Sequence, residues 1–161
     1  MTFRLGVAAG AAAILSLSNP AAAQVLTQRD VSLHMALTIA QTASQECGAN
    51  TSVAVVDRAG RLRVFLQGDN ANPHNIELAR RKAYTARTYR ISTVEFAKRI
   101  ATESDRPGLA MIKDALGLPG GLPIKVGNET IGGVGVAGAP GGNGDVACAE
   151  AAIEAVRDQL K

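Results

Sequence analysis

The spacing of hydrophobic residues predicts an amphipathic helix that begins at Thr27 and ends before Gly48. Thr27 and Asp30 have the spacing of a capping box, and a glycine after Cys47 is a common helix stop. His34 lies on the polar side of this helix. The apolar side chains recur every three or four positions and share the other side: Leu33, Ala36, Leu37, Ala40, Ala43 and Cys47.

Two short β-rich runs follow, at residues 52–57 and 61–67, and a connection containing Gly60 joins them. This pattern is typical of a hairpin. In the second run, Leu62, Val64 and Leu66 alternate with Arg61, Arg63 and Phe65, which predicts a sheet with one covered face.

The remaining pattern predicts more helices, a second hairpin and a last helix. Helices are expected at residues 75–89 and 92–104, whereas residues 106–121 fit a short helix, a strand or both. The second hairpin joins residues 122–126 to 130–139, and the last helix runs from Asp145, its N-cap, to Leu160. Strands joined as hairpins indicate an antiparallel sheet with helices packed on it, which is a single α+β domain over residues 24–161.

The first 23 residues have the three parts of a secretory signal peptide. Arg4 precedes an apolar run from Leu5 to Leu17, and Ala21-Ala22-Ala23 supplies the small residues of a cleavage site. The run is shorter than a membrane span, and no second long apolar run follows. We therefore expect a periplasmic or secreted protein that starts at Gln24 and does not span the membrane.

The size and charge of the predicted mature chain favour one domain that does not bind nucleic acid. Removal of 23 of the 161 residues leaves 138, and the formal charge falls from +3 to +2 because Arg4 is lost. A nucleic-acid protein normally shows a concentrated basic stripe with interleaved aromatic residues, and neither is evident here.

The two cysteines, Cys47 and Cys148, allow two interpretations. An oxidising compartment permits a disulfide between them. Two buried free thiols are the alternative, because cysteine is among the most buried residue types.

Gly133, Gly135 and Gly138 spell G-x-G-x-x-G within a predicted strand. A dinucleotide site needs these glycines in a turn between a strand and a helix. Within a strand they more often indicate that another backbone approaches closely.

The helix at residues 75–89 and the residue after it are strongly basic. Most such clusters are solvated faces, although a ligand with carboxylates would be a suitable acidic partner. No arrangement of nucleophile and base and no zinc-like spacing is present, so the sequence predicts no catalytic residue. The basic residues are Arg80, Arg81, Lys82, Arg87 and Arg90.

Four segments in order resemble the GlcG/HbpS family, also called the haem-degrading or DUF336 domain, which includes the PduO C-terminal domain. They are SVAVVDRAGRL, RRKAYTA, GGLPI and IGGVGVAGA, followed by Asp145 and Cys148. One segment departs from the family pattern: Gln67 to Ala71 stands where many relatives carry an Arg-Met-Asp-Gly-Ala-like run. The matching motif residues are Asp57, Gly60, Lys82, Thr85, Gly121, Pro123, Gly132 and Gly138.

The resemblance implies a profilin-like fold, an antiparallel sheet flanked by helices, and assembly into homo-oligomers. It also implies that the chain binds haem or a similar flat ligand, in haem handling or redox sensing. Two other functions stay open: an enzyme acting on haem or a small oxidised metabolite, and a non-catalytic ligand-sensing partner of another protein.

His34 is the one residue at a place comparable to the haem-ligating histidine of some family members. An exposed or Asp30-paired imidazole is the simple interpretation, and ligation of haem iron is the functional one. For the latter, Val31 and Met35 are expected beside the ring, Arg80 and Arg81 are expected to hold the propionates, and Lys82 and Thr85 are further candidate cofactor-binding residues.

Overall fold

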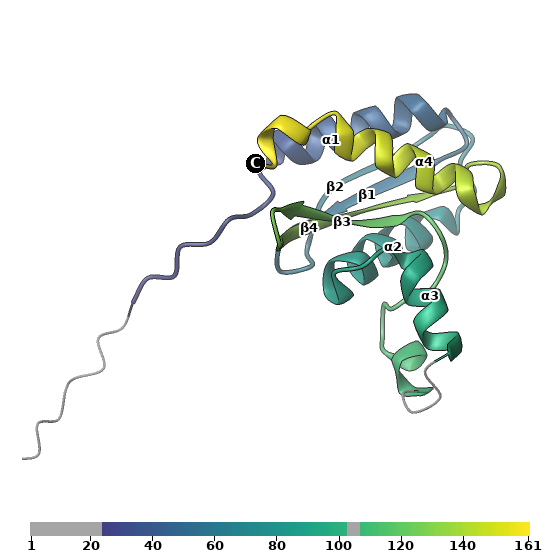
Figure 1. Cartoon of the computed structure of the whole chain (residues 1–161). Coiled ribbons are helices and arrows are strands. Elements are labelled where there is room, and N and C mark those ends of the chain that lie inside the picture. The colour runs from purple at the N-terminus through teal and green to yellow at the C-terminus, as the bar shows by residue number, and fades with distance from the viewer. Residues whose placement is uncertain (1–23, 103–106) are drawn as a thin grey trace, which may run out of the picture.

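The strands form one antiparallel sheet in the order β2-β1-β4-β3 (Figure 1). The computed structural model describes residues 24–102 and 107–161, so the predicted signal peptide lies outside the described residues. The single antiparallel sheet and its helices confirm the predicted α+β class and antiparallel pairing. The elements are α1 (Leu33–Cys47), β1 (Ser52–Val56), β2 (Leu62–Gln67), α2 (Asn75–Tyr89), α3 (Thr93–Thr102), the 3₁₀ helix η1 (Pro107–Met111), β3 (Gly121–Val126), β4 (Glu129–Ala137), α4 (Gly141–Glu154) and the 3₁₀ helix η2 (Arg157–Gln159).

Helices cover both faces of the sheet, which corrects the prediction of one covered face. Helices α1 and α4 lie side by side on one face, and α2 lies on the other, with α3 beyond it (Figure 1). Strand β1 is buried along its whole length: Val53 and Val55 face the α1/α4 core, whereas Ala54 and Val56 face α2. The prediction came from β2, which is an edge strand with exposed residues at both ends.

The glycines of β4 let α2 approach the sheet closely, as expected from a glycine-rich strand. A Cβ atom at Gly133 would collide with the carbonyl oxygen of Ala83, and one at Gly135 would collide with that of Ala79. The G-x-G-x-x-G spacing therefore serves packing between a helix and a sheet.

Gly135→Ala is expected to lower the free energy of unfolding by about 1–3 kcal/mol, because the added methyl group overpacks this interface. Urea unfolding of the purified protein measures the change. Gly108→Ala is the control, since a Cβ atom there meets open space. Equal stability of both variants would contradict close packing of α2 on β4.

Helix α1 begins at Leu33, later than predicted, because Asp30 has partners other than the start of a helix. Its Oδ1 accepts hydrogen bonds from the backbone N–H of Val31 and from that of Arg58. Ser32 is the N-cap, and its Oγ accepts from the Met35 N–H at 3.1 Å. Leu33, expected on the apolar side, is 54% exposed on the first turn.

Helix α4 begins at Gly141, before the start predicted at Asp145, so Asp145 is not its N-cap. The carboxylate of Asp145 turns away from its own helix. Its Oδ1 accepts from the Ala139 N–H at 2.8 Å, and its Oδ2 accepts from Lys82 on α2. A partner distant in sequence therefore decides the role of this carboxylate.

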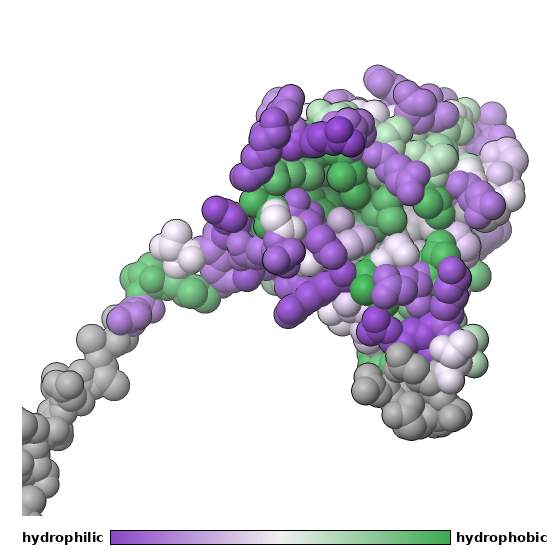
Figure 2. Space-filling model, in the orientation of Figure 1, coloured by the Kyte–Doolittle hydropathy of each residue, from purple (hydrophilic) through white to green (hydrophobic). Residues whose placement is uncertain are grey.

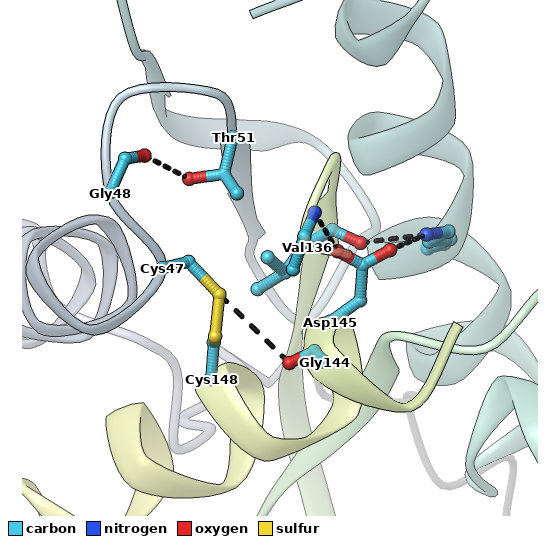
Figure 3. Close-up of a disulfide and its surroundings, with 9 residues drawn as sticks. Cys47, Gly48, Thr51, Val136, Gly144, Asp145 and Cys148 are labelled. Atoms are coloured by element: carbon cyan, nitrogen blue, oxygen red, sulfur yellow. Dashed lines mark hydrogen bonds and ion pairs between the residues drawn. A yellow bond between two sulfur atoms is a disulfide. The ribbon is translucent and has the colours of Figure 1, made fainter. Parts of the chain in front are cut away.

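A disulfide joins Cys47 at the end of α1 to Cys148 in α4 (Figure 3). Of the two interpretations open for the cysteines, the structure has the bridge. The Cα atoms lie 5.9 Å apart, within the range of ordinary disulfides. The bridge ties together the two helices that cover one face of the sheet.

Residues 107–120, for which the sequence left a helix, a strand or both open, contain the short helix η1 and otherwise irregular chain. Across residues 24–102 and 107–161, no helix is long and apolar enough to cross a bilayer.

Candidate functional site

Arg80, a predicted cofactor contact, is held by two carboxylates of the protein. Its Nη2 lies 2.8 Å from Glu77 Oε2 and 2.6 Å from Asp114 Oδ1. The hydrogen bonds that Arg80 donates to Asp114 and Glu77 raise the pKa of Arg80 above its ordinary value, and the same bond from Arg80 lowers the pKa of Asp114. A ligand carboxylate at Arg80 would have to displace these partners.

Arg81 and Thr85 fasten the chain before β3 to α2. Arg81 Nη2 donates to the Ala115 carbonyl at 2.7 Å. Thr85 Oγ1 donates to the Arg81 carbonyl and accepts from the Leu116 N–H, both at 2.8 Å. Arg81 Nε is buried without a hydrogen-bond partner in the structure. These contacts give both side chains a structural role.

Lys82 extends from α2 toward β4 and α4 and is nearly enclosed. Its Nζ donates to Asp145 Oδ2 at 2.7 Å and to the Val136 carbonyl at 2.8 Å. The side chains of Lys82 and Asp145 are 4% and 8% exposed. This buried ion pair connects α2, β4 and α4, so Lys82 is turned away from ligands in solution.

His34 lies exposed on the first turn of α1, apart from the four residues on α2. Within the described residues, its carbonyl accepts from Thr38 Oγ1 and its imidazole has no hydrogen-bond partner. The expected pairing with Asp30 does not form. Val31 and Met35, expected beside the ring, are 1% and 8% exposed and belong to the core between the sheet, α1 and α4.

The predicted site residues are therefore not gathered into one cavity. Ligation by His34 and propionate binding by Arg80 and Arg81 stay predictions. Among the residues that the structure describes, no group of three or more His, Cys, Asp or Glu side chains is arranged to hold a metal ion.

A surface pocket that the sequence did not indicate lies where the β1–β2 turn meets α2. It holds about 360 Å³, and an adjoining hollow of about 250 Å³ shares Arg58, Ala59 and Arg87 with it. We call the two together the arginine pocket. The lining of the larger part is Leu26, Gln28, Asp30, Arg58, Ala59, Arg61 and Arg87, and the smaller part adds Gly60, Tyr84 and Thr88.

The tight turn after β1 places two of the three arginines. Gly60 has a φ of +77°, which favours glycine, and its N–H donates to the Asp57 carbonyl at 2.9 Å. The Asp57 carboxylate accepts from the N–H groups of Ala59 and Arg61 and from the Arg61 guanidinium. Burial alone would raise the pKa of Asp57, but these hydrogen bonds lower it below the ordinary value.

The arginines of the pocket differ in how far their charge is neutralised. Arg58 pairs with Glu129 at 2.5 Å, and Arg61 pairs with Asp57 at 3.1 Å. Arg87 Nε donates to the Arg58 carbonyl, and no carboxylate of a described residue lies within ion-pair distance of Arg87. Burial, together with the charges of Arg90 and Arg58, lowers the pKa of Arg87.

Sequence reasoning found Arg87 as part of a basic helix but missed Arg58 and Arg61. The sequence feature that contains both residues is the turn DRAGR between two predicted strands. The pattern could not show that this turn lies against the second half of α2.

The family model described as "Haem degrading protein HbpS-like" matches residues 27–154. Among curated protein sequences, none shows significant similarity to the chain.

Several solved structures share the fold. A double mutant of HbpS from Streptomyces reticuli is 37% identical, with a TM-score of 0.76 over 85% of this chain and 96% of the other. A structure described as a complex of PduOC with haem is 25% identical, with a TM-score of 0.71 over 77% and 93% of the two chains. The DUF336 protein ORFY from Klebsiella pneumoniae, at 22% identity, has a TM-score of 0.76 over 84% and 97%.

Proposed function

Because the chain belongs to the HbpS-like haem-degrading family, we propose that it is an exported haem-binding protein with His34 as a ligand of the haem iron. The observation that carries this proposal is the state of the His34 imidazole. It is exposed and makes no hydrogen bond to any described residue. An imidazole without another partner would be a suitable ligand for haem iron.

The predicted site residues are better suited to bind the haem iron than to bind the haem propionates. His34 offers its ring, whereas Arg80 and Lys82 are already paired with carboxylates and Arg81 donates to a backbone carbonyl. When bound, haem supplies a redox-active iron, and the chain supplies the ligand that holds it.

Assembly into a homo-oligomer belongs to the same proposal. Leu33 is 54% exposed beside His34, so a second copy packed on this turn would shelter a haem from water. On the face shown in Figure 2, hydrophobic residues also gather between α4 and the β3 edge of the sheet. Leu122 and Ile153, from these two elements, are only partly buried.

The proposed location is the periplasm or the exterior of the cell. The disulfide between Cys47 and Cys148 supports it, because such bonds persist in oxidising compartments. The predicted signal peptide at residues 1–23 supports the same location.

Titration with haemin tests the proposal. His34→Ala is expected to weaken haemin binding about tenfold or more and to shift the Soret band, because the iron loses its protein ligand. His74→Ala is the matched control, since His74 is also exposed, and it should change neither quantity. An unchanged affinity and spectrum for the His34 variant would exclude ligation by this residue.

A further inference from the structure

The arginine pocket has an excess of positive charge. Five arginines lie in or beside it, and three carboxylates accompany them. Two cations are therefore left without a matching carboxylate. The cations are Arg29, Arg58, Arg61, Arg87 and Arg90, and the anions are Asp30, Asp57 and Glu129.

Arg87 is the cation best prepared for a ligand. Its Nε donates a hydrogen bond to the Arg58 carbonyl, and this bond orients the half-buried guanidinium. Its Nη atoms have no partner among the described residues. A guanidinium that is held in place but unpaired loses little side-chain entropy when it binds an anion, and its planar fork fits a carboxylate.

We propose that the arginine pocket binds a carboxylate of a small organic molecule, with Arg87 as the principal contact. Arg58 and Arg61 border the same pocket and add to its positive field. Leu26 and the Tyr84 ring provide apolar surface for the carbon part of the ligand.

The composition of the lining favours a carboxylate over a phosphate. Asp30 belongs to the pocket wall, and its Oδ1 already accepts two backbone N–H groups. A singly charged carboxylate meets less repulsion from this side chain than a doubly charged phosphate does.

The carboxylate has two chemical sources, a propionate of haem or a free organic acid. The first rests on the proposed haem binding and the second does not. Three probes separate them: haemin, haemin dimethyl ester, whose propionates are blocked, and succinate. Absorption titration follows the two haems, and calorimetry follows succinate.

Arg87→Gln is expected to weaken binding of the carboxylate about tenfold, the value of one hydrogen-bonded charge pair. Loss for haemin but not for its ester identifies a propionate. Loss for succinate with haemin unchanged identifies a free acid. Arg63→Gln is the control, because it removes the same charge from an exposed position outside the pocket lining. Arg61→Gln is a second pocket variant: the Arg61 side chain is 77% exposed, and its buried partner Asp57 keeps the N–H groups of Ala59 and residue 61 as donors.

Two results would overturn the proposal. One is an absence of succinate binding together with equal effects of Arg87→Gln on haemin and its ester. The other is wild-type affinity of both pocket variants for all three probes. If neither haem binds the wild-type protein, haem binding is wrong, and the succinate titration alone decides whether the pocket takes carboxylates.

Discussion

Lys82→Met is expected to lower the free energy of unfolding by about 3–5 kcal/mol, because it leaves the Asp145 carboxylate buried without its cation. The two charged groups lie 2.7 Å apart, and their side chains are at most 8% exposed. The same change removes a hydrogen bond to the Val136 carbonyl. Urea unfolding followed by circular dichroism measures the loss.

Lys98→Met is the matched control, since Lys98 also lies on a helix but is exposed. The free energy of unfolding of this variant should differ from that of the wild type by less than about 0.5 kcal/mol. The double variant Lys82→Met/Asp145→Asn should lose less than the sum of its single variants, because neither charge is then left alone. If the losses of the two single variants add up to the loss of the double variant, the two charges are not coupled, which would contradict the ion pair.

Removal of the Cys47–Cys148 disulfide is expected to lower the free energy of unfolding by about 2–5 kcal/mol. The bridge spans 101 positions in the sequence, and a long closed loop restricts the unfolded chain strongly. Cys47→Ala/Cys148→Ala should therefore unfold at a lower urea concentration than the oxidised protein.

Reduction of the wild-type protein provides an independent measurement of the same effect. The reduced protein and the double alanine variant should unfold at similar urea concentrations, and the reductant should not affect the variant. Equal midpoints for the oxidised and reduced wild-type protein would contradict a stabilising bridge.

Most elements could be predicted from the sequence because their patterns are local. Helix α2 was predicted at its observed bounds, 75–89, and the antiparallel hairpins follow from short β-rich runs joined by turns. Errors arose where a polar side chain has a distant partner. Asp30 resembles part of a helix cap but binds the N–H of Arg58, and Asp145 resembles an N-cap but pairs with Lys82.

The candidate site was less predictable than the fold for the same physical reason. The basic residues of α2 are visible in the sequence, but their partners are not local: Asp114 lies 34 positions from Arg80, and Asp145 lies 63 positions from Lys82. Arg87 differs from Arg80 and Lys82 in lacking a carboxylate partner among the described residues. Only the folded chain shows which of these cations are paired with carboxylates.

The contact between α2 and β4 is built from alanines and glycines, which makes it intolerant of larger side chains. Ala79 and Ala83 meet the glycines of β4 with no space for an added Cβ atom. The arginine pocket lies beside this contact: Arg87 adjoins Gly133 of β4, whereas Arg58 and Arg61 lie on the β1–β2 turn, outside the contact. Substitution of Arg58 or Arg61 would therefore change the charge of the pocket without altering the contact between α2 and β4. The centre of the sheet thus determines how closely α2 packs, and the turn at its border contributes to the charge of the pocket.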